Sequence, residues 1–391
     1  MKTPADGEIA LVARVAVPDK IIGLTLILDF IDRCPQNTSL ALPPAALGVL
    51  AQSRRATNCA TPGNEVYYTP PSGKMQPVIF SRMQFSCEES GGEKRRLLIL
   101  SQYVTLKLSI IRMLTAMALS AKSVRSQISK MMPLLKNCSL ETIRKGQNTI
   151  GALMKAKHRR QVMVKEHPFA RFSGAWIIPE DERRQGVILY IHGGGFTCGD
   201  LEYAKGFGST LAYQCGVRVF CAGYRLAPEN PFPAALEDVL EAYQYLLSKG
   251  YTPEHISLCG ESAGGGLCYS LCLKLKELGQ PLPGSIVAIS PWTDLTLSSE
   301  SYESNRKADP SMTVELLDYF RECYTEDCRN PLASPFFGDL TGMPPSLIFS
   351  GEDEIMLGDA QNLVQKLTDS GCEAKLTVRP ERWHAYLVYG L

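Results

Sequence analysis

The sequence GESAG at residues 260–264 has the spacing of a nucleophilic serine held in a tight turn. It fits the pattern G-x-S-x-G, and a predicted strand over Ile256–Leu258 precedes it while a predicted helix follows it. Such a turn strains the serine backbone, and glycines at both ends remove side chains that would clash there. We therefore predict that Ser262 is a nucleophile rather than part of an inert Gly-Ser-rich turn.

A glycine run, HGGGF at residues 192–196, follows the predicted strand Val187–Ile191. Acyl transfer builds an oxyanion, and backbone N–H groups of a glycine loop can point at it without hindrance from side chains. We predict that the amides of Gly193, Gly194 and Ala263 form this oxyanion hole. A phosphate loop would need a lysine and a Ser/Thr that are missing here, and GGGFTCG fits a dinucleotide loop poorly.

The base of the nucleophile follows from its position in the chain. The five histidines are His158, His167, His192, His255 and His384. In hydrolases with a G-x-S-x-G turn, the order along the chain is serine, acid, histidine, so that only His384 qualifies. We expect His192 to be structural, His158 and His167 to lie at the surface or in a cap, and His255 to lie in a solvated turn.

The acid that orients the histidine should follow the strand predicted over Pro345–Ser350. Three carboxylates, Glu352, Asp353 and Glu354, crowd the loop after that strand. Asp294, which follows the predicted strand ending at Ser290, is a fourth candidate. The residues alone leave these four open.

Further motifs support a family resemblance. Besides HGGGF and GESAGG, these are YRLAPE at 224–229, SPWTDLT at 290–296, ADP at 308–310 and the stretch 334–345. Over residues 149–391 the chain resembles the hormone-sensitive-lipase-like branch of the α/β hydrolases. From about residue 161 on, short apolar runs alternate with predicted helices, which indicates a mostly parallel central sheet with helices on both faces. The resemblance implies that this is an α/β-hydrolase fold with an N-terminal helical cap. It also implies a carboxylic-ester hydrolase for short or medium acyl chains.

The resemblance also ranks the acids and shows two departures from the family. The family pattern G-x-x-D/E-x-L-x-D, laid on Gly351, selects Glu354 over Asp353. Gly223 stands where the family usually has an acidic residue, so this loop is expected to be connected differently. The chain stops seven residues after His384, where the family continues with a closing helix; we expect a short helix or a clipped terminus.

Composition bounds the partners and the location. With 45% hydrophobic and 21% charged residues, the composition is typical of a globular protein. The net charge of +1 produces no strong electrostatic field that would attract nucleic acid. The 13 cysteines form no CxxC pair and no cluster with metal spacing. We therefore expect no metal and no cofactor, and a cytoplasmic location. Lys107 and Arg112 interrupt the apolar run 97–119, which argues against a membrane span.

The pattern along the chain predicts three regions: a weakly structured extension over 1–95, a helical cap over 96–157, and a catalytic domain over 158–391. Ser139 is the expected N-cap of a basic amphipathic helix in the cap. Three alternative functions stay open: a lipase for longer acyl chains, a non-catalytic small-molecule receptor on the same fold, and an amidase. The expected partner is a small ester, and a homodimer is left open.

Overall fold

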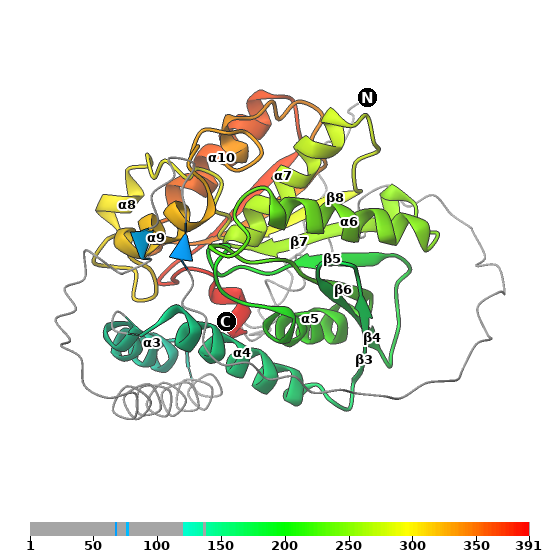
Figure 1. The fold of residues 1–391 in the computed structure, drawn as a ribbon, viewed down its shortest axis with the longest axis horizontal. Helices are drawn as coiled ribbons and strands as arrows, with labels where there is room; N and C mark the ends of the chain where they lie inside the picture. Colours follow the sequence, from blue (N-terminus) through cyan, green and yellow to red (C-terminus); the bar gives the residue numbers. More distant parts are fainter. Residues whose placement is uncertain (1–66, 69–75, 78–119, 136–137, 391) are drawn as a thin grey trace, which may run out of the picture.

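The computed structural model describes residues 67–68, 76–77, 120–135 and 138–390. A central sheet lies between two layers of helices (Figure 1). The predicted extension, 1–95, lies outside the described residues except for two short strands that pair antiparallel, β1 (Tyr67–Tyr68) and β2 (Gln76–Pro77). Residues 96–119 of the predicted cap also lie outside them.

Eight strands form the main sheet in the order β10-β9-β8-β7-β5-β6-β4-β3. The neighbours from β10 to β6 are parallel, which confirms the prediction of a mostly parallel sheet. The strands are β3 (Val162–Pro168), β4 (Ser173–Pro179), β5 (Val187–Ile191), β6 (Arg218–Gly223), β7 (Ile256–Glu261), β8 (Ser285–Ile289), β9 (Ser346–Gly351) and β10 (Ala374–Arg379).

An antiparallel pair of strands at one edge was not predicted. β4 pairs antiparallel with both β6 and β3, so the sheet ends in a hairpin. β3 carries Lys165, Glu166 and His167 in succession and leaves most of its side chains at least partly exposed. Because an edge strand with one solvated face lacks the continuous apolar run of the central strands, its signal in the sequence is weak.

Helices cover both faces of the sheet. In Figure 1, α6, α7 and α10 lie on one side of it, while α5, α4 and α3 lie on the other. The helices are α3 (Ala121–Leu135), α4 (Leu140–Lys157), α5 (Leu201–Cys215), α6 (Ala234–Ser248), α7 (Ala263–Glu277), α8 (Ser301–Ser304), α9 (Val314–Tyr324) and α10 (Leu357–Asp369). Three 3-10 turns are η1 (Pro253–His255), η2 (Pro335–Phe337) and η3 (Tyr386–Tyr389).

The central strands bury side chains on both faces, and β5 shows how. Val187, Leu189 and Ile191 belong to the core beneath α6 and α7, while Ile188 and Tyr190 belong to the core beneath α5. Successive side chains of a strand point to opposite faces, so a strand between two helical layers must be apolar throughout. This burial makes the strands a rigid platform for the loops at their carboxyl ends.

The two described cap helices, α3 and α4, precede the sheet. The predicted N-cap is confirmed, because the Ser139 hydroxyl accepts a hydrogen bond from the amide of Thr142 at 3.3 Å. α4 packs closely on α5 at Gly151, where a Cβ atom would lie 2.4 Å from the carbonyl oxygen of Glu202. The guanidinium of Arg144 donates to both carboxylate oxygens of Glu229 and to the carbonyl of Thr197. α4 is therefore anchored directly to the glycine loop.

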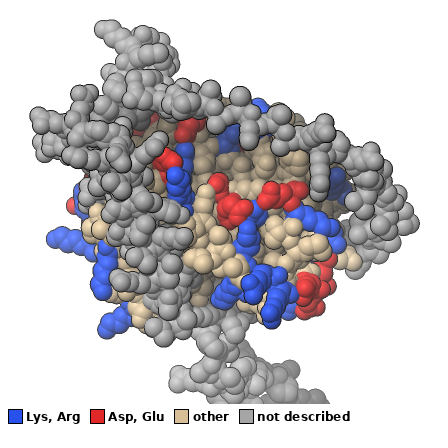
Figure 2. All heavy atoms as spheres, turned by 60° about the horizontal axis from the view of Figure 1, so that its bottom comes forward, with Lys and Arg blue, Asp and Glu red and all other residues tan. Residues whose placement is uncertain are grey.

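Charge is mixed on the face that Figure 2 shows, where Lys/Arg and Asp/Glu side chains lie interspersed. All ten cysteines of the described part of the chain are free. Across residues 120–135 and 138–390, no helix combines the length and the apolar character needed to cross a bilayer.

Candidate active site

Ser262 lies between the carboxyl end of β7 and the first residue of α7. Its backbone has φ 55° and ψ −123°, a conformation that few L-residues adopt, so the predicted strained turn is confirmed. The amide of Ser262 donates to the Ile289 carbonyl at 2.9 Å. The carbonyl of Ser262 accepts from Trp292 at 3.0 Å. These bonds hold the serine at the amino end of α7, where the helix dipole favours negative charge.

The two glycines of the turn are sterically required. A Cβ atom on Gly264 would lie 2.0 Å from the carbonyl oxygen of Ile191, and one on Gly260 would lie 2.4 Å from the carbonyl oxygen of Gly264. These contacts are with backbone, which cannot move aside without disturbing the sheet. The spacing of G-x-S-x-G thus reflects packing at the end of β7.

His384 and Glu354 are paired in the loops after β10 and β9. The Nδ1 of His384 lies 3.2 Å from Oε2 of Glu354, and both side chains are buried. The other oxygen of Glu354 accepts from the Ser350 hydroxyl and from the Gly351 amide. These donors fix the carboxylate. The Nε2 of His384 is buried and has no hydrogen-bond partner among the described residues.

The other candidate acids have different partners. Asp353 forms an ion pair with Arg125 at 2.5 Å. Asp294 accepts from Thr296 and Ser298 and shares no hydrogen bond with His384. Glu352 is exposed and accepts from the amide of Glu381. Of the four carboxylates that the sequence left open, Glu354 is therefore the one that contacts the histidine.

A further carboxylate, Asp309, was missed by the sequence reading. It is buried, and it accepts from the amides of Ser311, Met312 and Ile355. Burial raises its pKa, although the charge of His384 acts in the opposite direction. The only signal in the sequence was its place in the motif ADP, which does not show that the chain brings it near the histidine.

The pKa of His384 is raised above its ordinary value. Burial lowers it, but the hydrogen bond and charge of Glu354, followed by the charges of Asp309 and Glu261, outweigh this effect. These carboxylates stabilise the imidazolium that forms when the histidine takes a proton.

If His384 acts as a base, kcat/KM should fall as the pH drops through a pKa above about 6.5, because the imidazolium cannot accept a proton. In Glu354→Gln this acid limb should move to lower pH, since the partner that raises the pKa of His384 has lost its charge. A kcat/KM profile from pH 5 to pH 9 on both proteins, with thermal unfolding measured at each pH, tests this. An unchanged limb in the variant would contradict it.

The glycine loop departs from the prediction at Gly193. Its amide donates to Oε1 of Glu261 at 2.7 Å, so this N–H points at a carboxylate and not at the pocket. The assignment of Gly193 to the oxyanion hole is therefore corrected. The amides of Gly194, Gly195 and Ala263 have no hydrogen-bond acceptor among the described residues.

Glu261 is the second residue that the sequence reading missed. It lies next to the nucleophile in the chain, is buried, and also accepts from the Tyr190 hydroxyl at 2.7 Å and from Tyr203. Burial raises its pKa to about 7 in spite of these hydrogen bonds. It ties the glycine loop to the nucleophile turn. In G-x-S-x-G this position is unspecified, so the motif gave no signal for it.

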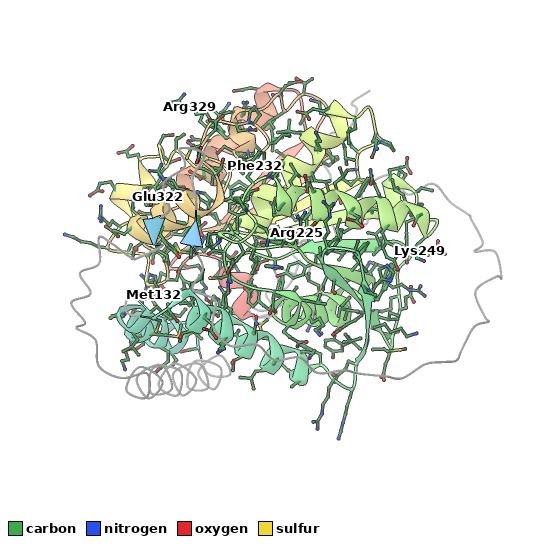
Figure 3. The ribbon with its side chains drawn as sticks, in the orientation of Figure 1. Met132, Arg225, Phe232, Lys249, Glu322 and Arg329 are labelled. Atoms are coloured by element: carbon green, nitrogen blue, oxygen red, sulfur yellow. The ribbon has the colours of Figure 1, made fainter. Side chains whose placement is uncertain are left out.

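Ser262, His384, Glu261 and Gly194 open onto one pocket of about 230 Å³. Its wall is mostly apolar and comes largely from α3, α4 and α9; Met132 on α3 is labelled in Figure 3. The larger aliphatic, methionine and phenylalanine side chains are Ile128, Met131, Met132, Leu135, Ile143, Ile150, Met312, Leu316 and Phe320. The pocket can thus hold an apolar group beside the serine.

None of the other four histidines lines the pocket. His192 is buried, stacks on Tyr224 at 4.2 Å, and has a pKa lowered by burial to about 4, which fits the expected structural role. His158 is buried at the end of the cap helix α4, so of the two predicted places, surface or cap, it lies in the cap. His167 stacks on Tyr245, and His255 pairs with Thr252 in a half-buried turn. Among the described residues, no His, Cys, Asp and Glu side chains gather as a metal site.

The main sheet is mostly parallel, a strained serine follows a central strand, and a histidine follows the last strand. Together these features define the class of α/β hydrolases. The family model described as alpha/beta hydrolase fold matches residues 188–388. Similarity to known proteins identifies the family within this class.

An acetyl-hydrolase of Streptomyces hygroscopicus is 37% identical over 217 residues, which cover 55% of this chain and 72% of that protein. An esterase of Acinetobacter venetianus is 34% identical over 52% of this chain and 68% of its own length. The crystal structure of an esterase from the bacterial hormone-sensitive lipase family superposes with a TM-score of 0.61 at 30% identity, covering 73% of this chain and 91% of that one. The chain belongs to the hormone-sensitive lipase family of α/β hydrolases.

Proposed function

We propose that this protein is a carboxylesterase that works through an acyl-enzyme on Ser262. The observation that carries the proposal is the convergence of three features on one apolar pocket: a strained serine, a buried His384–Glu354 pair, and amides without an acceptor. Relatives named esterase, acetyl-hydrolase and carboxylesterase support the same reaction class.

In the first half of the reaction, the Ser262 hydroxyl oxygen attacks the ester carbonyl while Nε2 of His384 takes its proton. Glu354 holds the imidazole through Nδ1 and stabilises its charge. We assign the oxyanion donors to the amides of Gly194, Gly195 and Ala263. Each such donor is typically worth about 3 kcal/mol of barrier.

The second half releases the two products. The imidazolium of His384 gives its proton to the leaving alcohol as the carbonyl carbon–oxygen bond breaks. Water then attacks the acyl carbon while His384 takes its proton. The bond between the acyl carbon and the Ser262 oxygen breaks, His384 returns the proton to that oxygen, and the carboxylic acid departs. Every proton is carried by one imidazole, so the proposal calls for no metal and no cofactor.

The size of the pocket supports short to medium acyl chains. Its volume of about 230 Å³ falls below the range of roughly 300–1,000 Å³ common for drug-sized ligands. An acetyl or butyryl group can contact the methionines and leucines of α3 and α9, whereas a palmitoyl chain must leave the pocket.

A panel of p-nitrophenyl esters from acetate to palmitate tests the function and the chain length together. We expect kcat/KM to peak at the short chains and to fall by about 10²-fold or more for palmitate, because a chain that does not fit displaces the carbonyl. Equal or faster turnover of palmitate would favour the long-chain lipase instead. Micelle formation must be checked at each concentration.

The other candidates are less well supported. A non-catalytic receptor has no need of a histidine held by a buried carboxylate, and it would hydrolyse no ester. An amidase uses the same groups, and turnover of a p-nitroanilide would favour it. We retain the cytoplasm as the proposed location because the ten cysteines of the described chain are free. Light scattering would settle whether a homodimer forms.

A further inference from the structure

Arg125 on α3 joins the cap to three separate loops. Its Nη1 donates to Oδ2 of Asp353 at 2.5 Å and lies 3.4 Å from the carbonyl oxygen of Glu381. Its Nη2 donates to the carbonyl oxygen of Ala308 at 2.5 Å. The three partners lie 183 to 256 residues away along the chain, so this guanidinium is a long-range tertiary link.

Each of these partners is a close neighbour in the chain of a residue of the candidate site. Asp353 directly precedes Glu354, Ala308 directly precedes Asp309, and Glu381 lies shortly before His384. The loops are also tied to one another, since the Asp353 amide donates to the Arg382 carbonyl at 2.9 Å. Arg125 therefore contacts the loops that carry the acid and the base, and it does so from outside the pocket, because it is not among the residues that line the pocket.

The same helix forms part of the pocket wall. Ile128, Met131, Met132 and Leu135 of α3 line the pocket, and Arg125 lies one turn before the first of them. An acyl group that fills the pocket would contact α3, and α3 contacts the loops of the acid and the base through Arg125. The planar fork of arginine suits this task because it donates in fixed directions, which a lysine ammonium does not do.

We propose that Arg125 is a positioning residue that couples occupation of the acyl pocket to the placement of Glu354 and His384. The inference rests on the proposed esterase function. Arg125 and Asp353 are partly exposed, at 31% and 25%, so their ion pair contributes little to folding. Displacing a catalytic group by a fraction of an ångström has a much larger effect on rate, up to about 10²-fold for 1 Å.

The test compares wild type with Arg125→Gln and Arg125→Lys on p-nitrophenyl acetate and butyrate, measuring kcat and KM separately. For butyrate we expect kcat to fall by about 10- to 100-fold with KM within about twofold. Acetate, whose acyl chain fills less of the pocket than that of butyrate, should lose less, so the ratio of kcat for butyrate to kcat for acetate should fall. Arg125→Lys should resemble Arg125→Gln, because it keeps the charge but not the fork.

Two further variants sharpen the result. Lys130→Gln removes an exposed cation from the same helix and should behave as wild type. If Arg125 acts through Asp353, the double variant Arg125→Gln/Asp353→Asn should lose little more than Arg125→Gln alone.

Three outcomes would overturn the inference. If the wild type is active and Arg125→Gln keeps the kcat of the wild type, this inference is overturned while the proposed function stands. An equal loss on both esters together with a lower unfolding midpoint would mean that Arg125 only stabilises the fold. A wild type that hydrolyses no ester overturns the proposed function, and this inference falls with it.

Discussion

Replacing Ser262 with alanine should lower kcat for p-nitrophenyl butyrate by about 10⁵- to 10⁶-fold, because the variant lacks the hydroxyl oxygen that forms the acyl-enzyme. The buried imidazole would be left without a proton donor. Steady-state kinetics at high enzyme concentration, with burst-phase analysis of the wild type, measure the loss. The wild type should show a burst of p-nitrophenol if deacylation is slow.

The control for this variant is Ser248→Ala, which removes an exposed hydroxyl at the end of α6 and should leave kcat unchanged. Alanine keeps the strained backbone at position 262, so both variants should unfold within about 1 kcal/mol of wild type. Turnover retained in Ser262→Ala would falsify the nucleophile assignment and move the chemistry elsewhere.

Glu354→Gln should reduce kcat by about 10³- to 10⁴-fold, the second largest effect that we expect. The amide cannot stabilise an imidazolium, and its NH₂ group favours the wrong tautomer of His384. Because Ser350 and Gly351 donate to the same oxygen of Glu354, the glutamine is expected to keep its carbonyl oxygen toward these two donors. Its NH₂ group then faces His384. KM should change much less than kcat, since Glu354 does not line the pocket.

Glu352→Gln is the matched control, because it removes an exposed carboxylate two residues away in the same loop. We expect its kcat within about twofold of wild type. If Glu352→Gln and Glu354→Gln lost activity equally, the general charge of the loop, and not the pair with His384, would be responsible.

The sequence was most informative where chemistry and chain order coincide. Ser262 could be predicted because a strand, two glycines and a helix must surround such a serine, and His384 because it is the one histidine of the sequence that follows Ser262. The parallel sheet was visible in apolar strands alternating with helices. The serine turn and the strands depend on residues close together in the chain, and the histidine depends on chain order alone.

Features that depend on distant partners could not be predicted in the same way. Glu354 and Asp353 are adjacent carboxylates that their own chemistry does not distinguish; in the structure Glu354 contacts His384, whereas Asp353 pairs with Arg125 of α3. The amide of Gly193 was misassigned because its acceptor, Glu261, is supplied by another strand. In both cases a tertiary contact decides between neighbours that look equivalent in the sequence.

The bond between Glu261 and Gly193 has a consequence for protein engineering. The side chain beside the nucleophile sets the position of the glycine loop, so these two segments are not interchangeable modules. A chimera that imports a glycine loop from a relative would have to import a compatible residue 261 and its tyrosine donors as well. Libraries that vary residues 192–196 should therefore vary position 261 in concert.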